Sequence, residues 1–299
     1  LLVSAIEHPS VASGGRFARE KIEEIPVTSQ GIVDLSALEA RLRELAAAGQ
    51  RLLVSIMHAN NETGVVQPVA AAATMVHASG GLLHVDAVQT AGRIPCDIMA
   101  LGADLLTISG HKLGGPQGVG ALIRSSQELH LADPLIKGGG QERGGRAGTE
   151  NVAAIAGFGA AAGAAAAALG ADGVLVRALR ERLEAGLLAT AANTVIFGSG
   201  AERLPNTTLF ALPGLKAETV LMALDLDGIA ASSGAACSSG KVTASRVVKA
   251  MGVAPDLGAG AVRLSLGRDT TESEIDRFIS AWRKVVSRLS SGVNRGLAA

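Results

Sequence analysis

The sequence has few aromatic side chains: 299 residues include no Tyr, one Trp and five Phe. Proteins that hold single-stranded nucleic acid usually stack its bases on aromatic rings, so this class of partner is disfavoured. An excess charge is also missing, because 27 basic and 27 acidic side chains give a formal net charge of zero. A neutral chain offers no electrostatic attraction to nucleic acid or to an anionic membrane. Small aliphatic residues must therefore supply the core.

Cysteine is scarce as well, with only Cys96 and Cys237. Two cysteines are too few for a disulfide framework or a cysteine-rich zinc site, and we expect a reducing, cytoplasmic location. The first residues, LLVSAIEH, contain no initiator Met, no basic region and no signal-cleavage site. This start is typical of the inside of a protein, so we expect a fragment of a longer chain.

The segment 152–171 carries no charge, over a length close to the ~20 residues that span a bilayer. Most of its residues are Ala and Gly, which gain little on transfer from water to lipid. We therefore predict a tightly packed soluble helix here and no membrane partner.

Strand-like and helix-like segments alternate in the first half of the chain, a pattern typical of a mostly parallel sheet with helices on both faces. Strands are predicted at 51–59, 81–85 and 104–108, with a helix at 68–79. Polar residues follow these strands, namely Asn61, Asp86 and Ser109. In open α/β sheets, ligands bind outside the carboxyl ends of the strands. These side chains are thus expected to converge on one crevice.

The second half has a different character, with charged helical stretches at 177–188 and 272–289. Short strands are predicted near 207–211 and 261–266. We place a domain boundary near Leu169, which gives a large domain at 1–168 and a smaller α+β domain at 169–299. Residues 290–299 are expected to form a frayed tail.

The densest polar cluster, His84, Asp86, Ser109, His111 and Lys112, suits two chemistries. Two histidines and the aspartate could form a facial triad for non-haem iron. Such triads need an all-β jelly-roll barrel, whereas this chain alternates strands with helices. The iron site is therefore the disfavoured alternative, and we predict no metal.

The second chemistry is that of a pyridoxal phosphate enzyme. A buried Lys112 would supply an amine that attacks the cofactor aldehyde, and Asp86 would keep the ring nitrogen protonated. Ser109, His111 and Thr149 could donate hydrogen bonds to the phosphate. Each residue alone favours an ordinary structural role, such as a solvated loop lysine or a helix cap. Their joint occurrence at strand ends favours the cofactor.

Longer motifs are EHPSV at 7–11, MHANNETG at 57–64, HVDAVQ at 84–89, SGHK at 109–112, GGGQERGGRAGTEN at 138–151, SSGAACSSG at 232–240 and VRLSLGR at 262–268. With these motifs, in this order over nearly the whole chain, the sequence resembles the cysteine desulfurases. These are class V aminotransferases of fold-type I, and the nitrogen-fixation and iron–sulphur-assembly branch is the most similar. The resemblance implies a homodimer that binds pyridoxal 5′-phosphate.

The resemblance also implies roles around the cofactor. Lys112 would form the imine, Asp86 would pair with the ring nitrogen, and His8 would stack on the ring. Gln89 and Asn61 would hydrogen-bond near the ring hydroxyl and the substrate. Ser109 and His111 would hold the phosphate, and Thr149 would reach it from the other subunit.

For the substrate, L-cysteine, the resemblance implies that Arg263 clamps the carboxylate with its planar guanidinium. Cys237 would be the nucleophile that takes the sulfur as a persulfide, leaving L-alanine, and would pass it to an acceptor or scaffold protein. Its Gly- and Ser-rich surroundings are too polar for a core strand and predict a mobile, exposed thiol, with Lys241 nearby to favour the thiolate. His8 would shuttle protons.

One departure from the family pattern concerns the start of the chain. The family's phosphate-cradling Ala-Thr loop belongs to a part that precedes the match to Leu1. Two alternatives therefore stand beside an active cysteine desulfurase. One is a selenocysteine lyase or another class V enzyme, and the other is an inactive truncated fragment that serves only as a binding subunit.

Overall fold

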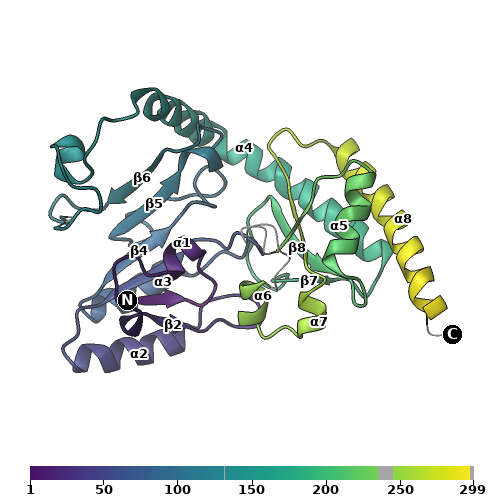
Figure 1. The fold of residues 1–299 in the computed structure, drawn as a ribbon, viewed down its shortest axis with the longest axis horizontal. Coiled ribbons are helices and arrows are strands. Elements are labelled where there is room, and N and C mark those ends of the chain that lie inside the picture. The colour runs from purple at the N-terminus through teal and green to yellow at the C-terminus, as the bar shows by residue number, and fades with distance from the viewer. Residues whose placement is uncertain (131, 235–244, 297–299) are drawn as a thin grey trace.

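The computed structural model describes residues 1–130, 132–234 and 245–296, and the side chains of 290–296 fall outside that description. Two sheets lie side by side, one built from the first half of the chain and one from the second half (Figure 1). A long helix, α4 (Val152–Thr190), runs along both of them.

The first sheet has six strands in the order β2-β1-β3-β4-β5-β6. Five of them are parallel, and β6 pairs with β5 in the antiparallel direction. The strands are β1 (Leu2–Ser4), β2 (Glu23–Ile25), β3 (Leu53–Met57), β4 (Leu82–Asp86), β5 (Leu105–Ser109) and β6 (Gly120–Arg124). The predicted α/β class with a mostly parallel sheet is therefore confirmed. So are the predicted strands at 51–59, 81–85 and 104–108, to within two residues at each end.

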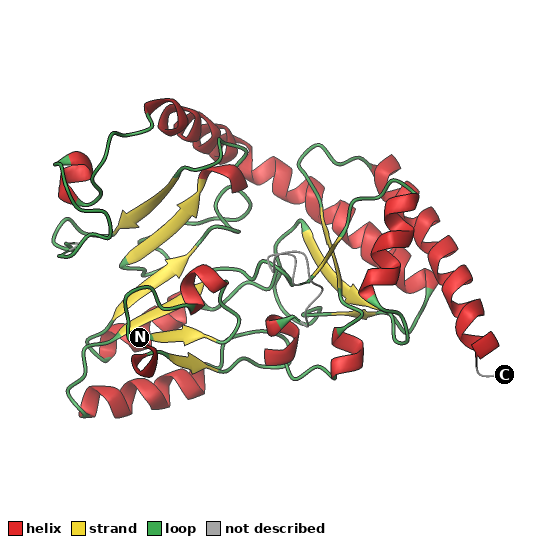
Figure 2. Ribbon diagram, in the orientation of Figure 1, coloured by secondary structure: helices red, strands yellow, loops and turns green. Residues whose placement is uncertain are grey.

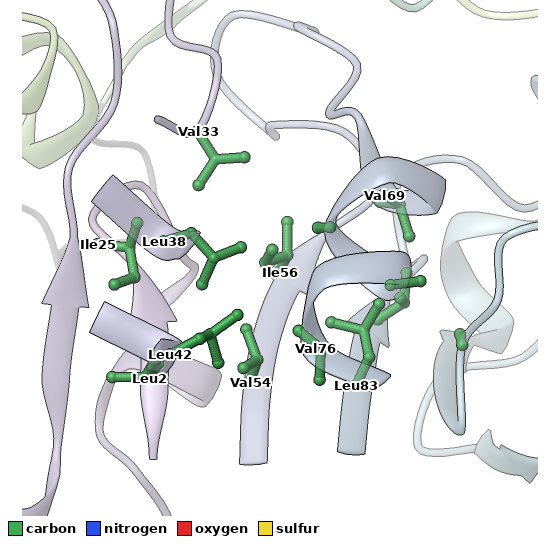
Figure 3. Close-up of a cluster of buried hydrophobic side chains, with 14 of the residues drawn as sticks. Leu2, Ile25, Val33, Leu38, Leu42, Val54, Ile56, Val69, Val76 and Leu83 are labelled. Carbon is green, nitrogen blue, oxygen red and sulfur yellow. The ribbon is translucent and has the colours of Figure 1, made fainter. Parts of the chain in front are cut away.

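Two helices, α2 (Leu35–Ala47) and α3 (Val69–Ala78), cover one face of this sheet. The Asp34 carboxylate caps α2 by accepting hydrogen bonds from the backbone N–H groups of Ser36 and Ala37. Leu38 and Leu42 lie one turn apart, so both enter the same core (Figure 3). This core also contains Val54, Ile56, Val76 and Leu83, and burial of such side chains stabilises each by roughly 1.5–3 kcal/mol.

Short elements connect the strands. They are α1 (Pro9–Ala12), η1 (Arg19–Lys21), η2 (Gly110–Lys112) and η3 (Gln141–Gly144). On the sheet face opposite α2 and α3, His84 shares hydrogen bonds with the hydroxyls of Ser55 and Thr107. Leu82 and Leu122, on the same face, are exposed.

The second sheet has four antiparallel strands in the order β7-β8-β10-β9, packed against helices (Figure 2). Its elements are β7 (Val195–Ile196), β8 (Thr207–Ala211), α5 (Ala217–Leu226), β9 (Ser232–Ser233), α6 (Arg246–Ala250), α7 (Pro255–Gly258), β10 (Val262–Ser265) and α8 (Glu272–Gly296). The core contains Phe210 and Trp282, whose rings meet edge to face at 5.3 Å between centroids. The predicted frayed tail is wrong for 290–296, because α8 continues to Gly296.

The helix α4 changes character along its length. Its second half contributes Val176, Leu179, Leu183 and Leu187 to buried positions. The first half is helical as predicted, but the prediction of tight packing is wrong: only 6% of its apolar window is buried, and Val152 is 71% exposed. By length and composition alone α4 could cross a membrane. The predicted boundary near Leu169 lies inside this unbroken helix, and the two domains remain a prediction.

A buried ionic network joins α4 to the second sheet. The Glu184 carboxylate accepts two hydrogen bonds from the Arg203 guanidinium, at 2.7 and 2.8 Å, and one from the Thr208 hydroxyl at 2.7 Å. Burial opposes ionisation of Glu184, but the hydrogen bonds from Arg203 and Thr208 win and lower its pKa. The negative charge of Glu184 is therefore compensated by the positive charge of Arg203 inside the protein.

We expect Glu184→Ala to lower the free energy of unfolding by about 3 kcal/mol, because it leaves the buried Arg203 without its counter-charge. The midpoint of urea denaturation measures the change. Glu181→Ala is the matched control on the same helix: Glu181 is exposed and 3.8 Å from Arg180, so about 0.5 kcal/mol or less is expected. An equal decrease in the free energy of unfolding in the two variants would contradict a special role for the buried Glu184–Arg203 pair.

Candidate functional site

The carboxyl ends of the central parallel strands lie side by side. In the pairing of β3 with β4, Met57 is opposite Asp86, and in the pairing of β4 with β5, Asp86 is opposite Thr107. The register continues into the loops, because His58 N donates to Asp86 O at 2.8 Å. The sequence-predicted residues that follow these strands are thus brought to one edge of the sheet. The expectation that they share this edge is confirmed.

Asp86 is the last residue of β4 and is buried. Its Oδ1 accepts a hydrogen bond from Val88 N at 3.0 Å, which fixes the carboxylate at the strand end. Among the described residues, no side chain forms an ion pair with Asp86. One carboxylate oxygen therefore remains available for a protonated ring nitrogen.

Ser109 ends β5, and the turn η2 carries His111 and Lys112 directly after it. The Ser109 hydroxyl and His111 Nδ1 are 2.8 Å apart, so the two side chains point to the same place. Arg93 joins the neighbouring loops, since it donates to the carbonyl oxygens of Gln89 at 2.8 Å and of Lys112 at 3.2 Å. The loops after β4 and β5 are thereby held together.

The expected burial of Lys112 is wrong within the described part of the chain, where its side chain is exposed and forms no ion pair. The turn η2 directs it away from the core. It borders a cavity of about 310 Å³ that also touches Gly92, Val176, Asn206 and Arg268. This cavity lies between the loops of the first sheet, α4 and the second sheet. Neither Asp86 nor Ser109 lines it.

At the end of β1, His8 caps the short helix α1. His8 Nδ1 accepts from Ser10 N at 3.2 Å and lies 2.8 Å from the Ser10 hydroxyl. The ring is half-buried. Its neighbour Glu7 is only 3% exposed, and Oε1 accepts a hydrogen bond from Met57 N at 2.7 Å. This bond ties the end of β1 to the end of β3.

The second oxygen of Glu7, Oε2, is buried and has no hydrogen-bond partner within residues 1–130, 132–234 and 245–296. Burial raises the pKa of Glu7 well above its usual value, with the charge of Asp86 adding to the effect and the Met57 N–H and Arg246 opposing it. Glu7 is therefore a buried carboxyl with a raised pKa that is joined to the end of β3. We assigned it no role from the sequence, although its place beside His8 at the end of an apolar run was a usable signal.

The second sheet adds Arg263, which lies on β10. Its Nη1 donates to Asn61 O at 2.8 Å, whereas its Nε is buried without a partner among the described residues. Asn61 is half-buried in the loop after β3. The structure thus brings Arg263 to the loop after β3 from a distant part of the chain.

Two predicted residues, Gln89 and Thr149, have no side-chain hydrogen bond to this cluster among the described residues, and a third falls outside the described part of the chain. Gln89 is half-buried in the loop after β4, where only its backbone oxygen is engaged, by Arg93. Thr149 is exposed in the segment before α4, and its backbone oxygen accepts a hydrogen bond from Arg146. Cys237 lies outside the described residues.

Cys96 fits a structural role. It is half-buried, it is a free thiol, and burial raises its pKa. In the parts of the chain that are described, no three His, Cys, Asp or Glu side chains gather as metal ligands. His84 instead uses its ring nitrogens for Ser55 and Thr107, and burial lowers its pKa. The geometry thus gives no support to the iron triad.

The strand-end residues fit pyridoxal phosphate. Asp86 presents a buried carboxylate with an available oxygen, as a protonated ring nitrogen requires. Ser109 and His111 form a hydrogen-bonded pair at the adjacent strand end, and the N–H or O–H that this bond does not use suits an anionic group. The Lys112 amine is free of ion pairs among the described side chains and follows them by a single turn.

Comparisons with known proteins agree with this geometry. The Aminotransferase class-V family matches residues 1–278. The chain is 40% identical to the cysteine desulfurase of Gluconacetobacter diazotrophicus, over 97% of this chain and 72% of that protein. It is 39% identical to the cysteine desulfurase NifS of Azotobacter vinelandii, over 97% and 71%. A NifS-like protein from Rickettsia africae has a similar solved structure, with a TM-score of 0.85, 40% identity and coverage of 96% and 75%.

We expect Glu7→Gln to change how stability depends on pH. A carboxyl whose pKa is raised by folding binds its proton more tightly in the folded state, so the wild type loses stability as pH rises from about 4.5 towards the folded-state value. The amide variant lacks this loss, which reaches at most about 1.4 kcal/mol per pH unit.

Urea denaturation from about pH 5 to about pH 8 measures the difference between the two proteins. Glu20→Gln, at an exposed position, is the control and should keep the wild-type profile. Parallel profiles for the wild type and Glu7→Gln would show that Glu7 does not titrate in this range.

Proposed function

Because the chain belongs to the class V aminotransferases and, among them, to the cysteine desulfurase family, we propose that it converts L-cysteine to L-alanine and takes up the sulfur on Cys237. The observation that carries the proposal is the placement of Asp86 beside the segment 109–112 at the ends of adjacent parallel strands. This placement puts an acid and the Ser109–His111 pair at adjacent strand ends, with the Lys112 amine in the turn that follows directly.

Pyridoxal phosphate, the cofactor of this family, supplies when bound an electron sink for the charge that develops at the substrate Cα. The residues of this chain hold it in place. Asp86 pairs with the ring nitrogen, and Ser109 and His111 donate to the phosphate. Lys112 would hold the cofactor aldehyde through its amine, and as a free amine it would take the proton from the substrate Cα. Its exposed position leaves room for both roles.

Arg263 holds the carboxylate of L-cysteine. Its Nη1 is fixed by Asn61 O, which leaves the other donors of the guanidinium for the substrate, including the unpartnered Nε. A planar guanidinium matches a carboxylate with two parallel hydrogen bonds. Gln89 and the Asn61 side chain contact the cofactor ring hydroxyl and the substrate, and His8 stacks on the ring and moves protons there.

Sulfur transfer follows from attack of the Cys237 thiolate on the sulfur of the substrate. An S–S bond forms at Cys237 while the C–S bond of the substrate breaks, and its electron pair stays with the carbon fragment. Protonation of that carbon gives L-alanine, and the enzyme keeps a persulfide. No external oxidant or reductant is needed, because one cysteine and one thiol give one alanine and one persulfide.

We further propose a homodimer in which Thr149 reaches the phosphate of the partner subunit. The exposed positions of Thr149 and of the apolar first half of α4 support this arrangement. The persulfide is handed to an acceptor or scaffold protein. The scarcity of cysteine and the free thiol of Cys96 support a reducing, cytoplasmic location.

We expect Lys112→Ala to lose the visible absorption band that lysine-linked pyridoxal phosphate gives, because no amine remains to hold the aldehyde. Absorbance of the purified protein after addition of the cofactor measures this. Lys137→Ala, which removes another exposed lysine, should keep the band. A wild-type chain that stays colourless with added cofactor would contradict the proposal and favour a non-catalytic binding subunit.

Cys237→Ser is expected to keep the absorption band and to abolish release of sulfide, since the serine hydroxyl does not form a persulfide. Alanine and sulfide are assayed together after incubation with cofactor, L-cysteine and a reductant. Cys96→Ser, which removes the half-buried cysteine, should release sulfide at the wild-type rate. Unchanged turnover in Cys237→Ser would instead indicate a selenocysteine lyase or another class V reaction.

A further inference from the structure

Glu62 is a buried carboxylate in the loop after β3 that the reaction described above does not use. It is 8% exposed, and burial raises its pKa to about 7, although the Ser245 hydroxyl and Arg263 act in the opposite direction. Burial of a carboxyl group lowers the stability of the fold unless its oxygens form hydrogen bonds. The contacts of this carboxylate therefore indicate what it does.

The backbone of Glu62 is held rigidly. The Asn60 side chain is fully buried, and its Oδ1 accepts hydrogen bonds from the backbone N–H groups of Glu62 at 2.9 Å and Thr63 at 3.0 Å. Its Nδ2 donates to Ile6 O at 3.1 Å, which ties the turn to the end of β1. Glu62 is thus fixed to the first sheet and can hold other segments in place.

The Glu62 side chain crosses to the second sheet. Its Oε2 accepts a hydrogen bond from the Ser245 hydroxyl at 2.5 Å, and the same hydroxyl caps α6 by accepting from Val248 N. Oε2 also lies against Gly234, where an added Cβ would be only 2.7 Å from it. The other neighbours of that Cβ would be at ordinary contact distances, Ser245 at 3.4 Å and Leu209 at 3.6 Å.

Gly234 and Ser245 are the described residues on either side of the segment that contains Cys237. One carboxylate from the first sheet therefore contacts both ends of that segment. Arg263 is adjacent, because it is bonded to the carbonyl of Asn61, the residue before Glu62. The two ends are thereby held at a fixed place relative to the group that binds the substrate carboxylate.

We propose that Glu62 is a positioning residue for sulfur transfer, whose contacts with Gly234, which follows β9, and with Ser245, which caps α6, fix the two described residues that flank the Cys237 segment relative to Arg263. The inference rests on the proposed function, in which Cys237 is the nucleophile. Glu62 touches neither substrate nor cofactor and acts through these two residues.

Glu62→Ala and Ser245→Ala test the proposal by removing either side of the hydrogen bond. We expect kcat for sulfide release to fall about 10- to 100-fold in each, because small displacements of a reacting group have effects of this size. The KM for L-cysteine and the visible absorption band should stay within about twofold of the wild type, since Arg263 and Lys112 are untouched. The double variant should lose no more than either single variant.

Two further variants, one that keeps a hydrogen-bond acceptor at Glu62 and one that changes its neighbour Gly234, test the same contacts in other ways. Glu62→Gln keeps an oxygen that accepts from Ser245 and should retain kcat within about threefold. Gly234→Ala pushes the Glu62 carboxylate aside and should lower kcat, and combining it with Glu62→Ala should add little further loss. Urea denaturation of the same single and double variants measures the Glu62–Ser245 coupling without any activity.

Glu24→Ala is the matched control, because Glu24 is an exposed acid of the first sheet that contacts Arg246, the residue after Ser245. It should keep the wild-type kcat. Additive losses in the double variant, or a loss in Glu62→Gln as large as in Glu62→Ala, would overturn the positioning role. A wild-type chain that releases no sulfide refutes the proposed function itself, whereas normal sulfide release by Glu62→Ala refutes only this inference.

Discussion

The parallel pairing of β3, β4 and β5 is the constraint on which the site depends. Its register sets Met57 opposite Asp86 and Asp86 opposite Thr107, so the loops that follow begin at the same level. A slip of one residue would turn every side chain of a strand to the other face of the sheet. Burial of Val54, Ile56 and Leu83 against α2 and α3 prevents such a slip. The hydrophobic core thus also fixes the chemistry at the strand ends.

A second constraint comes from the meeting of the two sheets. Arg263 reaches the carbonyl of Asn61 from β10, and Ser245 reaches the carboxylate of Glu62. Both contacts fall in one short loop after β3. Arg263, which is assigned to the substrate, therefore meets Asn61, which is assigned to the cofactor ring and the substrate, in a single turn. The Asn60 side chain stabilises this turn through its hydrogen bonds to the backbone.

Much of this arrangement could be predicted from the sequence, because polar residues that end apolar strands have few structural explanations. Asp86 and Ser109 were found in this way, and the resemblance to a family supplied roles for Arg263 and His8. Lys112 was expected to be buried, but a residue in a tight turn after a strand is covered only if another segment packs on it. Burial of this kind depends on tertiary contacts and leaves no local pattern.

The same reason explains the errors elsewhere. The first half of α4 has a composition that suits either close packing or exposure, and only its neighbours decide between them. Glu62 was missed because a lone acid carries no sequence signature of burial, and for Glu7 the only local signal was its place beside His8 after an apolar run. Their unusual surroundings arise from residues distant in the chain, such as Met57 for Glu7 and Ser245 for Glu62.

The unbroken course of α4 has a mechanical consequence. Near its start, Ala161 lies close to Gly115, just beyond the turn that carries Lys112, and its last turns form part of the core beneath β8 and β10. A helix of 39 residues is roughly 58 Å long and resists bending. α4 therefore joins, in one continuous element, the loop that follows Lys112 and the core beneath the sheet that carries Arg263.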